Sequence, residues 1–173
     1  MNVDTWTEQN KNKNYNYFGR HTSGDPIDYS FNYLGYRGKF YTDPDISIFG
    51  SSFSFGIGLN YNDCWHQNLG EYKVNCYAVA GWLINNNQIL ENYQKIKNQQ
   101  NIGTAIIQLR EFKYNTKELD LPNCNIFCID QQKNNNVMTF RYSSFLDLAL
   151  DNLHPGTRTH KQWAMILKNL WKL

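Results

Sequence analysis

Short apolar runs alternate with amphipathic stretches along most of the chain. Four of these runs are predicted to be buried strands, at residues 46–49, 74–79, 104–109 and 125–129. Continuous apolar runs of this length are typical of strands that are covered on both faces of a parallel sheet. The pattern therefore predicts a mostly parallel central sheet of four to five strands.

Helical periodicity follows or separates these runs. Residues 84–97 carry a loose apolar stripe, and residues 159–171 repeat apolar positions at helical spacing after the breaker pair Pro155-Gly156. Asp63 is suited to cap a short helix that continues to about Leu69. Alternating strands and helices predict an α/β three-layer sandwich, with helices on both faces of the sheet.

The remaining segments are interpreted as surface structure. Residues 1–27 are expected to be a flexible or surface-draped lead-in, because the first seventeen are rich in Asn and Lys and show little periodicity. Residues 28–173 are expected to form a single domain. Within it, residues 28–40 interleave aromatic side chains with glycine and predict turns and short extended pieces that wrap over the domain. Residues 114–119 and 131–136 are expected to be polar connectors.

Composition and charge exclude several classes of protein. The 173 residues include 41% hydrophobic and 16% aromatic residues, which is enough to build a core. The formal net charge of +2, from scattered lysines and arginines, does not indicate a nucleic-acid partner. No apolar run reaches the length of a membrane span, and no secretory leader is recognised, so a cytoplasmic location is expected. The abundant Asn, Lys, Ile and Tyr suit an AT-rich genome, viral or bacterial, and the oligomeric state stays open.

The four cysteines are interpreted as free buried thiols, because they lie in or beside apolar segments of a chain long enough to build its own core. They are Cys64, Cys76, Cys124 and Cys128. Only Cys124 and Cys128 are close in sequence, and no histidine lies near them, so no metal site is expected. No cofactor is expected either.

Two short motifs have the composition of a catalytic site. Ser52 follows the predicted strand 46–49 and Gly50, where a hydroxyl and its own N–H can face the rim of the sheet. Asp151 precedes His154 by three residues in a turn stopped by Pro155, so the carboxylate can orient the imidazole as a general base. Each motif also has an ordinary interpretation, namely a Ser/Gly turn without chemistry and a solvated histidine after a helix.

Together, the two motifs resemble the SGNH (GDSL-type) hydrolase superfamily. The segment GSSFSFGIGL at residues 50–59 is similar to the first block of that family, and DNLHPGTRTHKQWA at residues 151–164 is similar to the last. The segment KVNCYAVAGW at residues 73–82 is similar to the second block, which ends at the oxyanion-hole glycine. The segment FNYLGYRGKF at residues 31–40 is similar to a lead-in found in some branches.

The resemblance implies a flavodoxin-like SGNH fold and a Ser-His-Asp triad of Ser52, His154 and Asp151. It also implies an oxyanion hole formed by the N–H groups of Ser52 and Gly81. The chain departs from the family at Ser51, which replaces an aspartate outside the catalytic machinery, and in the third block. That block normally supplies an oxyanion asparagine, and Arg110 or Asn115 is the candidate replacement; losing one such donor costs about 3–4 kcal/mol of transition-state stabilisation.

The implied activity is hydrolysis of carboxylic esters, for instance acetyl esters on carbohydrate, through an acyl-enzyme. Aromatic residues of the lead-in could stack on sugars, but core packing is favoured for them. His160 is expected at the surface and outside the site. Two other functions stay open: a catalytically weak or inactive SGNH-like binding or structural protein, and a flavodoxin-like binder of flavin or nucleotide at the Gly50 turn. Labelling of Ser52 by a fluorophosphonate separates the first of these from an enzyme.

Overall fold

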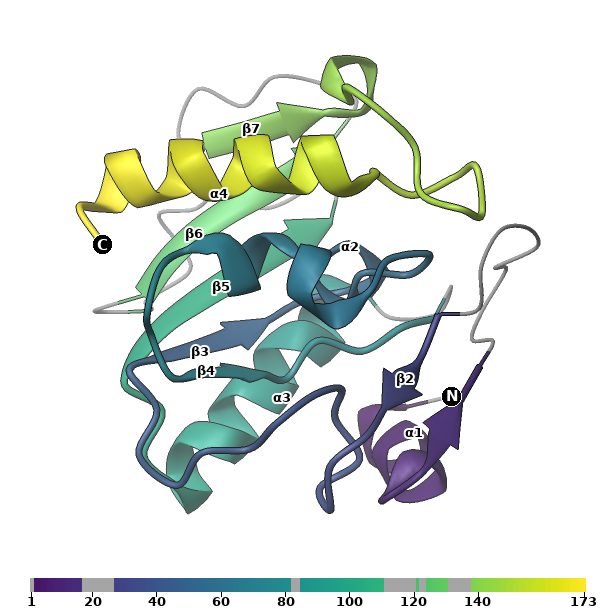
Figure 1. Ribbon diagram of the computed structural model, residues 1–173. Coiled ribbons are helices and arrows are strands. Elements are labelled where there is room, and N and C mark those ends of the chain that lie inside the picture. Colours follow the sequence, from purple (N-terminus) through teal and green to yellow (C-terminus); the bar gives the residue numbers. More distant parts are fainter. Residues whose placement is uncertain (1, 17–26, 82–84, 111–120, 122–123, 131–137) are drawn as a thin grey trace.

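The computed structural model describes residues 2–16, 27–81, 85–110, 121, 124–130 and 138–173 (Figure 1). Its main elements, in chain order, are α1 (Val3–Asn10), β1 (Asn14–Tyr15), β2 (Tyr29–Ser30), β3 (Ile46–Phe49), α2 (Ser52–Phe55), β4 (Val74–Cys76), α3 (Asn86–Gln99), β5 (Thr104–Arg110), β6 (Cys124–Asp130), β7 (Met138–Arg141) and α4 (Thr157–Trp171). Short 3-10 turns lie at Tyr61–Asp63, Trp65–Asn68 and Tyr142–Ser144.

The central sheet has five strands in the order β4-β3-β5-β6-β7, and every neighbouring pair is parallel. In order of appearance along the chain, this is the 2-1-3-4-5 arrangement of flavodoxin-like sheets. The strand order reverses between β3 and β5, and ligands of such sheets bind outside the carboxyl ends of the strands at that point. The predicted parallel sheet is confirmed, and β3 leads directly to Ser52 at this reversal.

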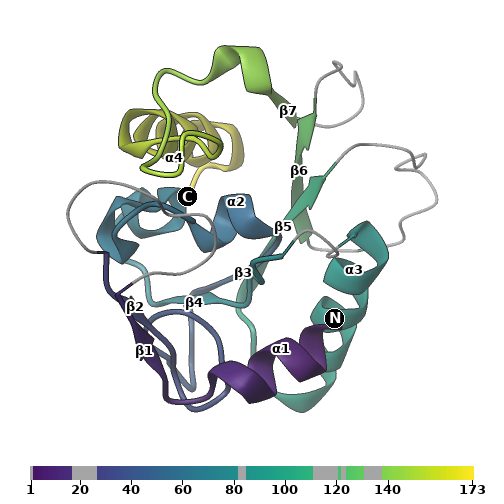
Figure 2. The same cartoon turned by 90° about the vertical axis from the view of Figure 1, so that its right-hand side faces the viewer.

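Helices cover both faces of the sheet, so the predicted three-layer α/β architecture is confirmed. Viewed along the sheet, α3 and α1 lie on one side and α2 and α4 on the other (Figure 2). Two apolar clusters occupy the two layers. The cluster beneath α3 includes Ile89, Tyr93 and Phe49, and the one beneath α4 includes Trp163 and Phe127. Both layers therefore have their own tightly buried aromatic core.

The prediction of a flexible or draped lead-in is wrong for residues 3–10. These residues form α1, which is capped by the Asn2 side chain accepting a hydrogen bond from the Thr5 N–H. Trp6 is only 3% exposed and packs edge-on against Phe31 and Phe55. Val3, Thr7 and Asn10 are buried with Trp6 at helical spacing, but two of these four positions are polar, so a search for apolar periodicity does not detect the helix.

Two local predictions also need correction, and one strand was not predicted. The helix expected from Asp63 to Leu69 is replaced by the two 3-10 turns, and the side chain of Asp63 caps neither of them. The strand expected over residues 74–79 ends at Cys76, after which the chain continues in extended form beside β3. Strand β7 was not anticipated. The connectors expected at residues 114–119 and 131–136 lie outside the described residues.

The cysteine prediction holds for most of the set. All four cysteines are free, and Cys64, Cys76 and Cys128 are buried, while Cys124 is half-buried. Burial raises the pKa of the Cys64 thiol to about 11, so it stays protonated at neutral pH. Among the described residues, no helix is both long enough and apolar enough to cross a membrane.

Candidate active site

Ser52 is held in a tight turn at the carboxyl end of β3. Ser51 is in an extended conformation and serves as the N-cap of α2, and Ser52 is the first residue of that helix. The short helix ends at Gly56, whose left-handed conformation suits glycine. On the β4 side, the Val79 N–H donates to the Gly50 carbonyl oxygen at 3.0 Å, which fixes the backbone just before the turn. Ser52 itself is 8% exposed.

The Asp-x-x-His motif lies in an ordered loop that precedes α4. The Asp151 Oδ1 atom accepts hydrogen bonds from the N–H groups of Leu153 and His154, both at 3.0 Å. Asn152 adopts a left-handed conformation, which asparagine tolerates in such turns. The Ala149 N–H donates to the His154 carbonyl oxygen at 2.8 Å and closes the loop. The spacing of the motif is thus a consequence of a side chain that caps its own turn.

Ser52, His154 and Asp151 form a continuous hydrogen-bonded chain. The His154 Nε2 atom lies 2.9 Å from Ser52 Oγ, and its Nδ1 atom lies 2.5 Å from Asp151 Oδ2. The Asp151 side chain is fully buried, while the His154 side chain is 17% exposed. Because Nδ1 contacts the carboxylate, the proton belongs on Nδ1 and leaves Nε2 free to accept the serine proton. The structure therefore brings together all three residues of the predicted triad.

The carboxyl group of Asp151 stays ionised next to His154. Burial by itself raises the pKa of Asp151, but hydrogen bonds from the His154 ring and from the N–H groups of His154 and Leu153 outweigh it. The net result is a pKa below the ordinary aspartate value. An ionised carboxylate in this place fixes the imidazole tautomer and stabilises the imidazolium that forms when the ring takes up a proton.

Close contact between two loops brings the serine and the histidine together across 102 residues of sequence. Gly58, which follows α2, has a positive φ of 77°. A Cβ atom at this position would lie 2.8 Å from the Ala149 side chain and 3.3 Å from the Asp151 nitrogen. Only a residue without a side chain permits so close an approach. The glycine-rich segment after Ser52 is therefore needed for assembly of the triad.

Two backbone N–H groups at this end of the sheet are unpaired. Within the described part of the chain, neither the Ser52 nor the Gly81 N–H has an acceptor. Gly81 follows Val79 by two residues, and Val79 pairs with Gly50 two residues before Ser52, so Gly81 comes from the same end of the sheet. Unpaired backbone N–H groups at the end of a sheet are the kind of donor from which an oxyanion hole is built.

Arg110 and Asn115 are the candidates for the third oxyanion donor. The backbone of Arg110, at the end of β5, is held by the Asn86 side chain, which accepts from its N–H at 2.8 Å and donates to its carbonyl oxygen at 2.7 Å. This anchors the end of β5 to the start of α3. Asn115, the other candidate, lies outside the described residues.

Sequence reasoning missed two buried polar residues next to the serine turn. The Gln108 amide oxygen accepts hydrogen bonds from Ser51, and the Arg37 guanidinium donates to the carbonyl oxygens of Phe55 and Gly56 at the end of α2. Gln108 is fully buried and Arg37 is 1% exposed. A polar residue inside the otherwise apolar run 104–109 was the available signal for Gln108.

The expectation that His160 lies at the surface is wrong, because it is 1% exposed and Nδ1 accepts from the Trp65 N–H at 2.9 Å. His66 is also buried and has Nε2 3.1 Å from the Ser54 carbonyl oxygen. Burial lowers the pKa of His66 to about 3 and that of His160 well below its usual value. Both rings are therefore neutral structural groups at physiological pH.

A buried neutral histidine makes the fold sensitive to acid. Below pH about 6.5 the unfolded chain protonates His66 and the folded chain does not, so the free energy of unfolding falls as the pH is lowered. Between pH 7 and pH 5, His66→Gln should therefore lose about 2 kcal/mol less stability than the wild type. Urea unfolding of both proteins at the two pH values measures the difference. Equal losses in the two proteins would show that His66 does not contribute.

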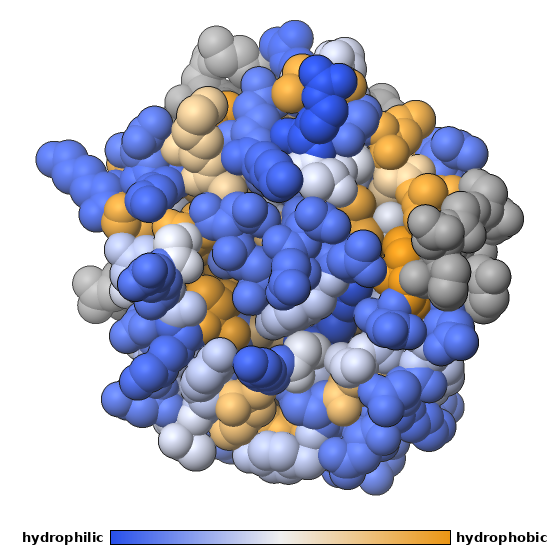
Figure 3. Space-filling model, viewed as in Figure 1, coloured by the Kyte–Doolittle hydropathy of each residue, from blue (hydrophilic) through white to orange (hydrophobic). Residues whose placement is uncertain are grey.

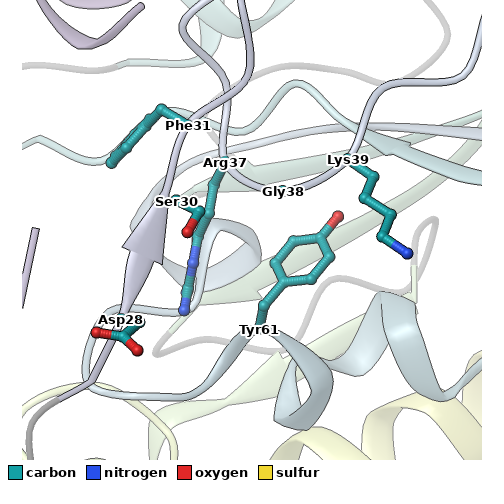
Figure 4. A pocket seen from close by; sticks show the side chains of 7 residues that line it. All are labelled: Asp28, Ser30, Phe31, Arg37, Gly38, Lys39 and Tyr61. Atoms are coloured by element: carbon teal, nitrogen blue, oxygen red, sulfur yellow. The ribbon is translucent and has the colours of Figure 1, made fainter. Parts of the chain in front are cut away.

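The structure has a surface cavity of about 310 Å³, and none of the three triad residues lines it. It is lined by Asp28, Ser30, Phe31, Arg37, Gly38, Lys39 and Tyr61. The Arg37 and Tyr61 side chains lie along two sides of it (Figure 4). The same Arg37 side chain donates to the carbonyl oxygens of Phe55 and Gly56 at the end of α2. It therefore connects the lining of the cavity to the short helix that begins at Ser52.

No group of three or more metal-ligating side chains is found among the residues that the structure describes. The candidate site consists of Ser52, His154, Asp151 and backbone N–H groups. Comparison with known proteins adds nothing to this geometry: neither the protein-family models nor the curated proteins give a significant match to the chain.

Proposed function

We propose that the protein is a serine hydrolase of carboxylic esters, similar in mechanism to the SGNH hydrolases. The observation that carries the proposal is the unbroken contact from Ser52 Oγ to His154 Nε2, at 2.9 Å, and from His154 Nδ1 to Asp151 Oδ2, at 2.5 Å. Nucleophile, base and orienting carboxylate in hydrogen-bond reach are the geometric signature of nucleophilic acyl transfer.

The reaction follows from these contacts. His154 Nε2 takes the Ser52 proton as Oγ attacks the ester carbonyl carbon, and the N–H groups of Ser52 and Gly81 stabilise the oxyanion. The tetrahedral intermediate collapses, and the protonated His154 donates its proton to the departing alcohol. A water molecule, deprotonated by His154, then attacks the acyl carbon. The bond from that carbon to Ser52 Oγ breaks, the acid is released, and His154 returns the proton to Oγ. The residues of the site supply each of these steps with Asp151 ionised throughout.

The surroundings of His154 suggest which part of the substrate is apolar. The face seen in Figure 3 is mainly hydrophilic, with apolar side chains in small separate patches. Three of the exposed large apolar residues belong to the loop that carries His154, namely Leu146, Leu148 and Leu153. In the proposed reaction His154 donates its proton to the departing alcohol. The loop that carries His154 would therefore lie next to the alcohol part of the bound ester.

The aromatic side chains of residues 28–40 do not offer a wide stacking surface for sugars. Tyr29, Phe31 and Tyr36 are at most 5% exposed, as expected for core packing, while Tyr33 is 54% exposed. An acetyl ester on carbohydrate stays a proposed substrate on the resemblance alone. Esters with a simple aromatic alcohol are the better first substrates.

Hydrolysis of p-nitrophenyl acetate and butyrate tests the proposal. We expect steady turnover by the wild type and a loss of at least about 10³-fold in Ser52→Ala, because the nucleophile is removed. Ser143→Ala, at an exposed serine, is the matched control and should retain full activity. A folded wild type that is no faster than Ser52→Ala would favour the alternative, an inactive SGNH-like binding or structural protein.

A further inference from the structure

The side chain of Gln108 joins β5 to the turn that precedes Ser52. Its Oε1 atom accepts from the Ser51 N–H at 3.0 Å, from Ser51 Oγ at 3.0 Å and from Ser54 Oγ at 3.3 Å. Its Nε2 group donates to the Leu109 carbonyl oxygen at 2.8 Å. Every polar atom of this fully buried amide is therefore paired.

The chemistry of the partners fixes which way the amide points. The Ser51 N–H can only donate, so the atom that faces it must be the amide oxygen. The Leu109 carbonyl oxygen can only accept, so the atom that faces it must be the amide nitrogen. Both ends of the side chain impose the same orientation, and rotating the amide by 180° would break both contacts.

Gln108 can approach the serine turn closely because residue 50 is a glycine. A Cβ atom at Gly50 would lie 2.8 Å from Gln108 Oε1 and 2.8 Å from Ser54 Oγ. The absence of a side chain at Gly50 thus admits the amide to the turn. With the Gly50 carbonyl oxygen held by Val79 and Ser51 held by Gln108, the two residues before Ser52 are fixed from both sides.

We propose that Gln108 is a positioning residue for the nucleophile. Gln108 makes its polar contact with residue 51. The resemblance leads one to expect an aspartate at that position, and this chain has Ser51. By accepting from the N–H and hydroxyl groups of Ser51, Gln108 fixes the Gly50–Ser51 peptide and the Ser51 side chain, and so the backbone that leads into Ser52 and directs its N–H and Oγ. The inference rests on the proposed hydrolase function.

The test compares the rate of phosphonylation of Ser52 by a fluorophosphonate in variants of similar stability loss. Gln108→Met keeps the side-chain length but removes the acceptor, and we expect the second-order rate constant per folded molecule to fall about 10- to 100-fold. KM for p-nitrophenyl acetate should change much less than kcat, since substrate contacts are not altered. Gln108→Glu retains an oxygen facing Ser51 and, as burial favours the protonated carboxyl, a donor facing Leu109, so it should recover most of the rate.

Asn92→Leu is the matched control. Asn92 is 4% exposed on α3 and bonds Tyr36 and Tyr77, so its loss also leaves buried partners unpaired. It does not contact the serine turn, and its phosphonylation rate should stay within about 2-fold of the wild type. Should Gln108→Met fail to fold, Ser51→Ala replaces it, with about a 3- to 10-fold slower rate expected.

The outcomes separate the two proposals. Phosphonylation of the wild type with equal rates in Gln108→Met and Asn92→Leu overturns the role of Gln108 and leaves the hydrolase intact, as does an unchanged rate in Ser51→Ala. A Gln108→Glu protein as slow as Gln108→Met contradicts the assignment to the amide oxygen. A folded wild type that is not phosphonylated overturns the proposed function, and the role of Gln108 with it.

Discussion

Replacing His154 with alanine is expected to lower kcat for an activated ester by about 10⁶-fold. The His154 Nε2 atom is the base that contacts Ser52 Oγ, and an alanine leaves the hydroxyl with no group to accept its proton. Asp151→Asn should lower kcat by about 10⁴-fold, because an amide no longer favours the tautomer with the proton on Nδ1. Steady-state kinetics with p-nitrophenyl acetate measures both losses.

The pattern of the combined variants is as informative as the size of each loss. Residues that act as one unit have strongly non-additive effects, so a Ser52→Ala/His154→Ala protein should be no slower than either single variant. Both single variants should keep the circular dichroism spectrum of the wild type. A His154→Ala protein that retains more than about one tenth of the activity would contradict the assignment of the base.

Arg37→Met is expected to reduce the free energy of unfolding by at least about 3 kcal/mol. The Arg37 guanidinium is 1% exposed and donates to the carbonyl oxygens of Phe55 at 2.8 Å, Gly56 at 2.7 Å and Leu59 at 2.6 Å. It also stacks on the Tyr29 ring at 4.3 Å. A methionine fills the same length but removes three buried hydrogen bonds from a charged donor, each worth about 1 kcal/mol or more.

The control for this prediction is Arg141→Met, because Arg141 is exposed on β7. Its stability should stay within about 0.5 kcal/mol of the wild type. Arg37→Lys should be nearly as damaging as Arg37→Met, since a single ammonium cannot serve three carbonyl oxygens in a fixed fan. Urea unfolding measures all three variants. A loss of less than about 1 kcal/mol in Arg37→Met would show that other groups hold the segment after α2.

The architecture was predictable because it depends on local patterns that are strong in this chain. The runs at 46–49, 104–109 and 125–129 became β3, β5 and β6, and the stripes near 84–97 and 159–171 became α3 and α4. Helix α1 was missed because two of its four buried positions, Thr7 and Asn10, are polar, and β7 was missed because four residues carry too little pattern. Packing in three dimensions can thus decide the state of a polar segment.

In the candidate site, only the residues that belong to short sequence motifs were predictable. Ser52, Asp151 and His154 stood out because residue type and local spacing already suggested a chemical role, and the structure places them in contact. Gln108 and Arg37 were not singled out for a role, since their function depends on partners 18 to 57 residues away. The burial of His160 was mispredicted for the same reason: its partner Trp65 is 95 residues away.

The most direct test of the central claim is mass spectrometry of the folded protein after treatment with a fluorophosphonate. Ser52 as the activated nucleophile predicts one adduct per chain, located on the peptide that contains Ser52 and absent from His154→Ala and from protein unfolded in urea. No adduct on the folded wild type, or an adduct on another serine that persists in Ser52→Ala, would contradict the claim that this triad activates Ser52.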